Sequence, residues 1–216
     1  MLSDKTDTWV PVALAQDLPP GTAMPARIPA GSIALWRSQS GRVAASADRC
    51  PHRGMRLSHG FVRGEQLSCI YHGWSYSQAG NCVRIPAHPG LVPPDTIRAV
   101  THATDEAGGI VWVANGEPPA GPPLFEGFVP LRSLLVHAGR AALAAAGAKA
   151  AEDGVSWEMP GTTPIRLLPV PQEDGETLIH VLVPEGCTAP ERIAASRAVE
   201  SLRRMAERIE AKGIVS

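Results

Sequence analysis

Two short segments of the chain pair a cysteine with a histidine at spacings suited to metal binding. The first, CPHRG, places His52 two residues after Cys50, and the second, CIYHGWSY, places His72 three residues after Cys69. Sixteen residues separate His52 from Cys69. Thiolate and imidazole groups are characteristic ligands of transition metals. These four residues are therefore the candidate metal ligands.

One cysteine and one histidine from each of two loops meet the needs of a particular [2Fe–2S] cluster. In that cluster two thiolates bind one iron and two imidazoles bind the other. Gly54 and Gly73 follow the ligating segments directly. We expect them to let the backbone turn sharply and to bring N–H groups to the sulfurs. Because neutral imidazoles replace two thiolates, the reduction potential is expected to exceed that of an all-cysteine cluster. The imidazole edges would then face outward and give electrons a route in and out.

Two other interpretations use the same residues. Two cysteines and two histidines also form tetrahedral zinc sites, but a zinc finger usually pairs Cys with Cys and His with His, and a short helix follows. Here each loop mixes the two residue types, and candidate strands flank both loops. A disulfide between Cys50 and Cys69 would leave the two histidines without a role. The cluster is the favoured interpretation.

The first half of the chain has the pattern of short strands and turns. Candidate strands are the apolar or β-branched runs at 9–13, 33–37, 42–47, 66–70, 74–77 and 109–114. The segment SQSG joins the second and third of these runs as a hairpin. Strands at this spacing predict a small antiparallel sandwich or barrel over residues 9–116.

The segment EPPAGPP at 117–123 is too rich in proline and glycine for regular structure and is interpreted as a linker. Residues 124–216 then form a second domain. Its Ala-rich stretch 131–151 is predicted to be helical, and 165–168 and 177–183 are predicted strands.

The end of the second domain is predicted to be a long amphipathic helix over 190–212. The residues TAPE at 188–191 fit a capping box. An apolar stripe would follow one face of this helix. Its members are Val199, Leu202, Met205, Ala206 and Ile209.

Composition excludes several classes of function. The 216 residues are 44% hydrophobic and 19% charged, with a net charge of −1, which is typical of a globular protein. No basic run suggests a nucleic-acid partner, and no apolar stretch is long enough to span a membrane. The polar N-terminus does not resemble a signal peptide. We therefore expect a cytoplasmic protein whose cysteines, at 50, 69, 82 and 187, are thiols or metal ligands.

The segment DRCPHRGMRLSHGFVRGEQLSCIYHGWSY, with GNCVRIPAHP after it, resembles the Rieske domain of aromatic-ring-hydroxylating and demethylating oxygenases. The resemblance runs from about Trp9 to about Trp112. It implies a Rieske-type [2Fe–2S] cluster in which Cys50 and Cys69 bind one iron and His52 and His72 bind the other. It also implies an α+β chain: an N-terminal all-β Rieske domain, formed as an antiparallel sandwich, followed by a small α+β domain resembling a reduced oxygenase catalytic domain.

Rieske proteins of respiratory complexes have an additional cysteine in each loop, and here those positions are Met55 and Tyr71. Trp74 stands where those proteins have a serine, and Tyr76 is a candidate for a hydroxyl near the cluster. Fewer donors to the sulfurs predict a potential toward the low end of the Rieske range.

The resemblance weakens after residue 123. The catalytic domain of an oxygenase binds a mononuclear iron through two histidines and a carboxylate, and the helical motif that supplies them is missing here. The segments WEMPGTTPIRLLPVP and TLIHVLVPEG, with the final helix, resemble scattered pieces of that domain. We interpret this half as a pared-down catalytic domain and assign it no catalytic residue.

Four functions are compatible with this sequence. The favoured one is a Rieske subunit that passes electrons to a mononuclear iron on a partner subunit. The others are a free ferredoxin-like carrier, a redox sensor, and a complete oxygenase with an unusual site made of His137, His180 and Glu152 or Asp153. The expected partners are a reductase or ferredoxin as electron donor and a catalytic oxygenase subunit or further copies of the chain, with no nucleic acid and no membrane. Arg53, Arg56 and Arg63 are candidates for docking an acidic reductase, although a solvated loop is the commoner role of such residues.

Overall fold

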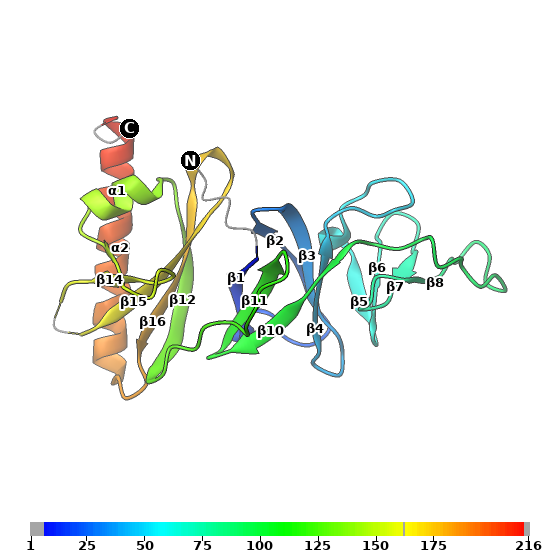
Figure 1. The fold of residues 1–216 in the computed structure, drawn as a ribbon, viewed down its shortest axis with the longest axis horizontal. Helices are drawn as coiled ribbons and strands as arrows, with labels where there is room; N and C mark the ends of the chain where they lie inside the picture. The colour runs from blue at the N-terminus through cyan, green and yellow to red at the C-terminus, as the bar shows by residue number, and fades with distance from the viewer. Residues whose placement is uncertain (1–6, 162, 214–216) are drawn as a thin grey trace. The chain divides into compact units, whose positions relative to one another are not determined.

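The computed structural model describes residues 7–161 and 163–213 (Figure 1). These residues form two compact units. The N-terminal unit contains residues 7–107 and 111–122, and the C-terminal unit contains residues 108–110 and 123–213. Residues 116–127, which include the predicted linker, lie in no strand or helix, and the division between the units falls at 122/123.

The N-terminal unit is built from short strands in three sheets, with two single-turn 3-10 helices. The sheet orders are β1-β11-β10, β2-β3-β4-β9 and β5-β6-β7-β8. The strands are β1 (Thr8–Leu14), β2 (Ala23–Ile28), β3 (Gly31–Arg37), β4 (Val43–Ala47), β5 (Phe61–Arg63), β6 (Gln66–Ser68), β7 (Ser75–Tyr76), β8 (Cys82–Arg84), β9 (Thr101–His102), β10 (Thr104–Ala107) and β11 (Ile110–Asn115). The 3-10 helices are η1 (Ala15–Asp17) and η2 (Leu57–His59).

The hairpin predicted around SQSG is confirmed. Strands β3 and β4 pair in antiparallel register, with Ile33 opposite Ala47 and Arg37 opposite Val43. Apolar residues of β3, among them Leu35 and Trp36, are buried because this strand is central in its sheet.

The sheet β5-β6-β7-β8 carries one of the two candidate ligand loops and packs on a small apolar core. That core contains Leu57, Leu67 and Tyr76, together with the thiols of Cys50 and Cys69. The predicted strands 66–70 and 74–77 are shorter in the structure, at Gln66–Ser68 and Ser75–Tyr76. The residues between them form a tight loop rather than extended strand.

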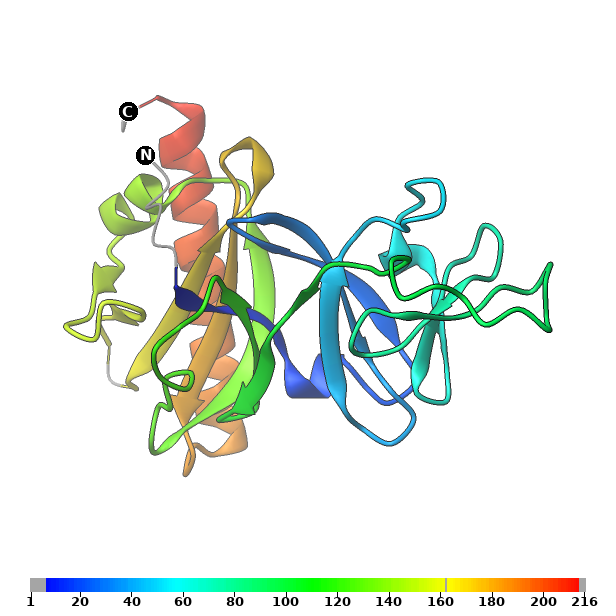
Figure 2. The same cartoon turned by 45° about the vertical axis from the view of Figure 1, so that its right-hand side comes forward.

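The C-terminal unit has one five-stranded antiparallel sheet of order β12-β16-β15-β14-β13 and two α-helices. The strands are β12 (Phe128–Val136), β13 (Lys149–Ala150), β14 (Trp157–Met159), β15 (Ile165–Pro171) and β16 (Thr177–Pro184). The helices are α1 (Arg140–Ala145), α2 (Ala189–Ala211) and the 3-10 turn η3 (Glu173–Gly175). Figures 1 and 2 show α2 lying along one face of this sheet. The α+β class predicted for the chain is confirmed.

The C-terminal helix is predicted well in extent and less well in its buried face. Its capping box is present: the N–H of Glu191 donates to the side chain of Thr188, and the N–H of Thr188 donates to the carboxylate of Glu191. The buried residues are Ala195, Val199, Leu202 and Ala206, spaced by four, three and four. Met205, which was predicted on the stripe, is 49% exposed because it lies at the edge of that face.

The prediction of a helix over 131–151 is wrong. Strand β12 occupies its first part, paired with β16 so that Leu134 faces Ile179, and only Arg140–Ala145 is helical. Leu134 and Val136 are buried while Leu135 is 41% exposed, which is the alternation of a strand. The alanines therefore form a short helix after the strand rather than one long helix.

None of the helices among the described residues is long and apolar enough to cross a membrane.

Candidate metal centre

The two Cys–His loops close in the same way. In the first loop the N–H of Cys50 donates to the carbonyl of Met55, at 2.8 Å, and the N–H of Gly54 donates back to the carbonyl of Cys50, at 2.8 Å. In the second loop the N–H of Cys69 donates to the carbonyl of Trp74, at 2.9 Å, and Gly73 donates back to Cys69, also at 2.9 Å. Each cysteine thus begins a loop of equal length, closed by a glycine four residues later.

The glycine of each loop is required by its conformation. Gly54 has φ = 74° and Gly73 has φ = 70°, in the left-handed region that a side chain disfavours. A Cβ on Gly73 would also lie 3.0 Å from Cγ of Pro86. The role predicted for these glycines as turn residues is confirmed.

The histidines occupy different positions in these equivalent loops, yet their rings meet. His52 is the second residue after its cysteine and His72 the third. Their ring centroids are 4.7 Å apart with the planes at 65°. Two further aromatic rings pack against the histidines. The ring of Trp74 stacks on His52, with centroids 4.2 Å apart and planes at 4°. The ring of Tyr71 packs at a tilt against His72, with centroids 3.8 Å apart and planes at 34°.

The two thiols also form a pair. Cys50 and Cys69 are each 2% exposed and belong to the same apolar core. The pKa of Cys69 is raised, chiefly by burial and also by Cys50, and the N–H groups of Tyr71 and His72 act in the opposite direction because they point at its sulfur. Those two N–H groups are donors of the kind expected to stabilise a bound thiolate.

Tyr76 supplies a further donor. Its hydroxyl lies 3.1 Å from Sγ of Cys50. The pKa of Tyr76 is raised above its usual value, first by burial and then by this hydrogen bond, so the phenol keeps its proton. The predicted hydroxyl near the cluster is therefore in contact with a candidate ligand sulfur.

One atom tests whether these residues fit a metal cofactor. Nδ1 of His52 is buried and has no hydrogen-bond partner among the described residues. A buried polar atom without a hydrogen-bond partner costs free energy unless a ligand binds it. The pKa of His52 is lowered by desolvation and by the nearby His72 and Arg53, which favours the neutral imidazole that binds metals. The residues fit a bound metal group.

The site is organised as two pairs rather than as a cage around one ion. In the parts of the chain that the structure describes, no group of three or more His, Cys, Asp or Glu residues is placed to hold a single ion. The two thiols lie in one apolar core, and the two imidazole rings contact each other. Two separate pairs are the arrangement that a two-iron cluster with two Cys and two His ligands requires.

Three of the four residues considered for a second iron site have other partners. His137 is exposed and its Nδ1 lies 2.5 Å from Oε1 of Glu176, while Nδ1 of the buried His180 lies 2.8 Å from Oγ of Ser133. Asp153 pairs with Arg166 at 2.9 Å. The expected role of His180 as a strand residue is confirmed, but His137 lies just after β12 and not in a helix.

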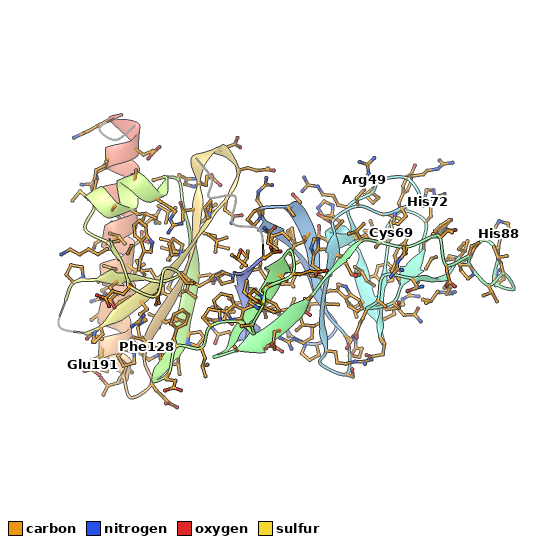
Figure 3. All side chains as sticks on the ribbon, in the orientation of Figure 1. Arg49, Cys69, His72, His88, Phe128 and Glu191 are labelled. Atoms are coloured by element: carbon orange, nitrogen blue, oxygen red, sulfur yellow. The ribbon has the colours of Figure 1, made fainter. Side chains whose placement is uncertain are left out.

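The remaining cysteines and histidines lie outside these pairs. Cys82 and Cys187 are free thiols. His59 ends η2, and His88 lies in the loop after β8, at the far tip of that loop in Figure 3. The stacking of Trp74 on His52 could not be predicted from the sequence, because the contact depends on how two loops from different parts of the chain meet.

Two equivalent Cys–His loops, one of them borne on a small antiparallel sheet, bring together two buried thiols and two solvent-accessible imidazoles, which is what a Rieske-type centre would require. Comparison with known proteins agrees, since residues 8–99 match the family model of the Rieske [2Fe-2S] domain. The chain therefore carries a Rieske [2Fe–2S] domain, and its cofactor is a Rieske-type [2Fe–2S] cluster.

Relatives of this domain are found among oxidoreductases and oxygenases. The chain is 42% identical to the oxidoreductase NdmD of Pseudomonas putida over 115 residues, which cover 53% of this chain and 20% of NdmD. It is 36% identical to the 4beta-methylsterol monooxygenase of Methylococcus capsulatus over 112 residues, which cover 51% of this chain and 30% of that protein. The match thus spans less than a third of either relative.

Solved structures extend the likeness of fold beyond the Rieske domain. NdmA of Pseudomonas putida CBB5 matches with a TM-score of 0.72 and 17% identity, covering 93% of this chain and 81% of that chain. Dicamba monooxygenase bound to dicamba matches with a TM-score of 0.72 and 18% identity, covering 97% and 91%. At these identities the comparison shows a shared fold.

Proposed function

We propose that this chain is the Rieske component of an oxygenase system and passes electrons to a mononuclear iron on a partner subunit. Cys50 and Cys69 would bind one iron of the cluster, and His52 and His72 the other. The observation that carries this proposal is the convergence of two buried thiols and two touching imidazoles from loops of equal closure. When bound, a cluster of this kind takes up and releases one electron.

The residues of the chain set the conditions for that exchange. The hydroxyl of Tyr76 and the N–H groups of Tyr71 and His72 point at the sulfurs of Cys50 and Cys69, where they would stabilise negative charge. The thiols are buried, which keeps water from the sulfur side of the site. His72 is exposed, so its ring edge is the accessible side.

The placement of the reacting iron on a partner is supported by what the other histidines do. His137 follows β12 and is hydrogen-bonded to Glu176, whereas His180 lies in β16 and is hydrogen-bonded to Ser133. An iron site of the two-His, one-carboxylate type needs two imidazoles directed at one point. The expected partners are a reductase or ferredoxin as donor, and a catalytic oxygenase subunit or further copies of this chain as acceptor.

Turnover measurements test this proposal. The purified chain, supplied with NADH, a generic reductase and a panel of aromatic substrates, should be reduced and reoxidised without forming a hydroxylated or demethylated product. Addition of a catalytic oxygenase subunit should restore product formation. Product formed by the isolated chain would contradict the proposal and favour a complete oxygenase. A monodisperse monomer in light scattering that ignores every candidate subunit would favour a free carrier.

A further inference from the structure

We propose that the surface beside the imidazole edge docks an acidic electron-transfer protein. The cationic edge, as we call it, consists of Arg49, Arg53 and Arg56 from the first loop, with Ile70, Tyr71 and His72 from the second. The proposal rests on the proposed function, since it names the surface by which the electron donor would approach and the charge that donor must carry.

The segment that carries the two loops is positively charged. Residues 49–92 contain five arginines and one carboxylate, which give a charge of +4, whereas the whole chain carries −1. The one carboxylate, Glu65, is already engaged by Arg42 at 3.0 Å and by the hydroxyl of Ser40 at 2.8 Å. Asp48, just before this segment, is buried and bonded to Ser58. Neither of these carboxylates therefore pairs with an arginine of the cationic edge.

The arginines of the cationic edge differ from several others in the chain because they form no ion pair with the residues that the structure describes. Arg37, Arg166 and Arg203 each lie within ion-pair distance of a carboxylate, at 2.7, 2.9 and 2.6 Å. Among the described residues, no carboxylate lies within that distance of the three arginines of the cationic edge. Guanidinium groups form bidentate bonds with carboxylates readily, so unpaired ones are available to a partner.

Arg49 and Arg53 lie at the first loop. The guanidinium of Arg49 lies over Gly54, with Nε 3.4 Å from where a Cβ would stand, so this cation covers the closure of the first loop. Arg53 directly follows His52 in the sequence and is exposed. Figure 3 shows Arg49 and His72 at the same end of the N-terminal unit.

Exposed apolar groups complete this surface. Ile70 is 58% exposed and Tyr71 is 55% exposed, in the two positions directly before His72. An apolar centre with a charged rim is the usual composition of a protein–protein contact. Opposite charges on the rim would steer the partner and raise the rate of association. An acidic partner would thereby be brought to the imidazole edge, where the distance for electron transfer to the cluster is shortest.

Binding measurements on the full, cluster-containing chain test the proposal. The probe is an oxidised plant-type [2Fe–2S] ferredoxin, which is acidic and has a potential low enough to reduce a Rieske cluster. A basic c-type cytochrome is the probe of opposite charge. Calorimetric titration should show that the ferredoxin binds, and that its Kd rises at least about tenfold between ~20 and ~200 mM NaCl. The cytochrome should bind more weakly than the ferredoxin at low salt.

Two charge-reversed variants locate the surface. Arg53→Glu with Arg56→Glu should weaken ferredoxin binding at least about tenfold at low salt. The matched control, Lys149→Glu with Arg197→Glu, changes the net charge equally but at exposed positions of the C-terminal unit, and should stay within about twofold of the wild type. Arg53→Gln with Arg56→Gln is a milder variant, expected to show an intermediate effect even if the reversed variant folds poorly.

The outcomes separate this proposal from the proposed function. Equal ferredoxin binding by the cationic-edge and control variants, or tighter binding of the cytochrome, would overturn the docking surface. If the wild-type chain lacks the visible absorption of a [2Fe–2S] cluster, the proposed function fails instead. A cluster that is present and reducible by dithionite, with ferredoxin binding insensitive to these arginines, would overturn the docking surface alone.

Discussion

The imidazole of His52 lies flat against the indole of Trp74, with ring centroids 4.2 Å apart and planes 4° from parallel. The same ring has a buried Nδ1 without a hydrogen-bond partner among the described residues. Stacking on Trp74, together with the edge contact to His72, therefore holds the plane of this imidazole in place. Metal affinity depends on such supporting contacts, which are commonly worth about ten- to a hundredfold.

Replacement of Trp74 should therefore loosen the cofactor. We expect Trp74→Leu to lose its visible absorption in the presence of EDTA about tenfold faster than the wild type, because His52 loses its flat support. Trp74→Phe retains an aromatic face and should differ from the wild type by less than about threefold. The backbone carbonyl that accepts from Cys69 is present in both variants. Equal stability of the Leu variant and the wild type would show that the stacking does not position His52.

Tyr76 should raise the reduction potential. Its hydroxyl, 3.1 Å from Sγ of Cys50, would stabilise the additional negative charge of the reduced site. Tyr76→Phe should lower the midpoint potential by about 40–60 mV, which corresponds to roughly 1 kcal/mol of differential hydrogen bonding.

The chain has two tyrosines, and the other one provides the control. Tyr71 is 55% exposed and leans on His72 through its ring. Tyr71→Phe keeps that ring and should leave the potential within about 10 mV of the wild type. Potentiometric titration of the three proteins side by side decides the matter. A shift of the same size in both variants would contradict the assignment of Tyr76.

An ion pair distant from the cluster site should make stability depend on pH. Arg37 is largely buried, and its guanidinium bonds both oxygens of Glu106, at 2.7 and 2.8 Å. This pairing lowers the pKa of Glu106 from its usual 4.5. A carboxylate with a lowered pKa contributes stability above its unfolded pKa and loses it as the pH falls through the folded value.

Glu106→Gln should thus cost about 1 kcal/mol of unfolding free energy at pH 7, a modest value because Glu106 is 37% exposed to screening solvent. The difference between variant and wild type should shrink toward zero as the pH falls below 4.5. Urea unfolding at matched pH measures this difference in unfolding free energy. Because both proteins carry the same cluster site, that site contributes equally to both. A difference that grows on acidification would contradict the sign of this effect.

A change of ligand should move the potential in a known direction. His72→Cys replaces a neutral imidazole with a thiolate, so the reduced site carries more negative charge. The midpoint potential should fall by an amount on the order of 100 mV, toward that of all-cysteine clusters. His59→Cys adds a cysteine at an exposed position outside the two pairs and should leave the potential unchanged. An unchanged potential in a His72→Cys protein that still contains the cluster would exclude His72 as a ligand.

The predictable parts of this protein are those governed by local sequence. The turns at Gly54 and Gly73, the hairpin of β3 and β4, and the capped helix α2 depend on glycine, strand alternation and a capping box, and all are visible in the sequence. The four candidate ligands were recognised from their spacing. In contrast, β12 was predicted as helix because the alanines that follow it have high helix propensity. Pairing with β16 overrides that propensity.

The contacts that cross between loops could not be predicted. The stacking of His52 on Trp74 joins residues 22 positions apart, and the bond from Tyr76 to Cys50 joins residues 26 apart. Both depend on the packing of the β5-β6-β7-β8 sheet against the first loop. Residue type suggested a hydroxyl near the site, but only the fold shows which sulfur it reaches.

The determination of iron and acid-labile sulfide in the purified chain tests the central claim most directly. Two pairs of ligands, Cys50 with Cys69 and His52 with His72, predict two irons and two labile sulfides per chain. Three irons per chain would contradict the placement of the mononuclear iron on a partner. Zinc without labile sulfide would contradict the Rieske assignment altogether.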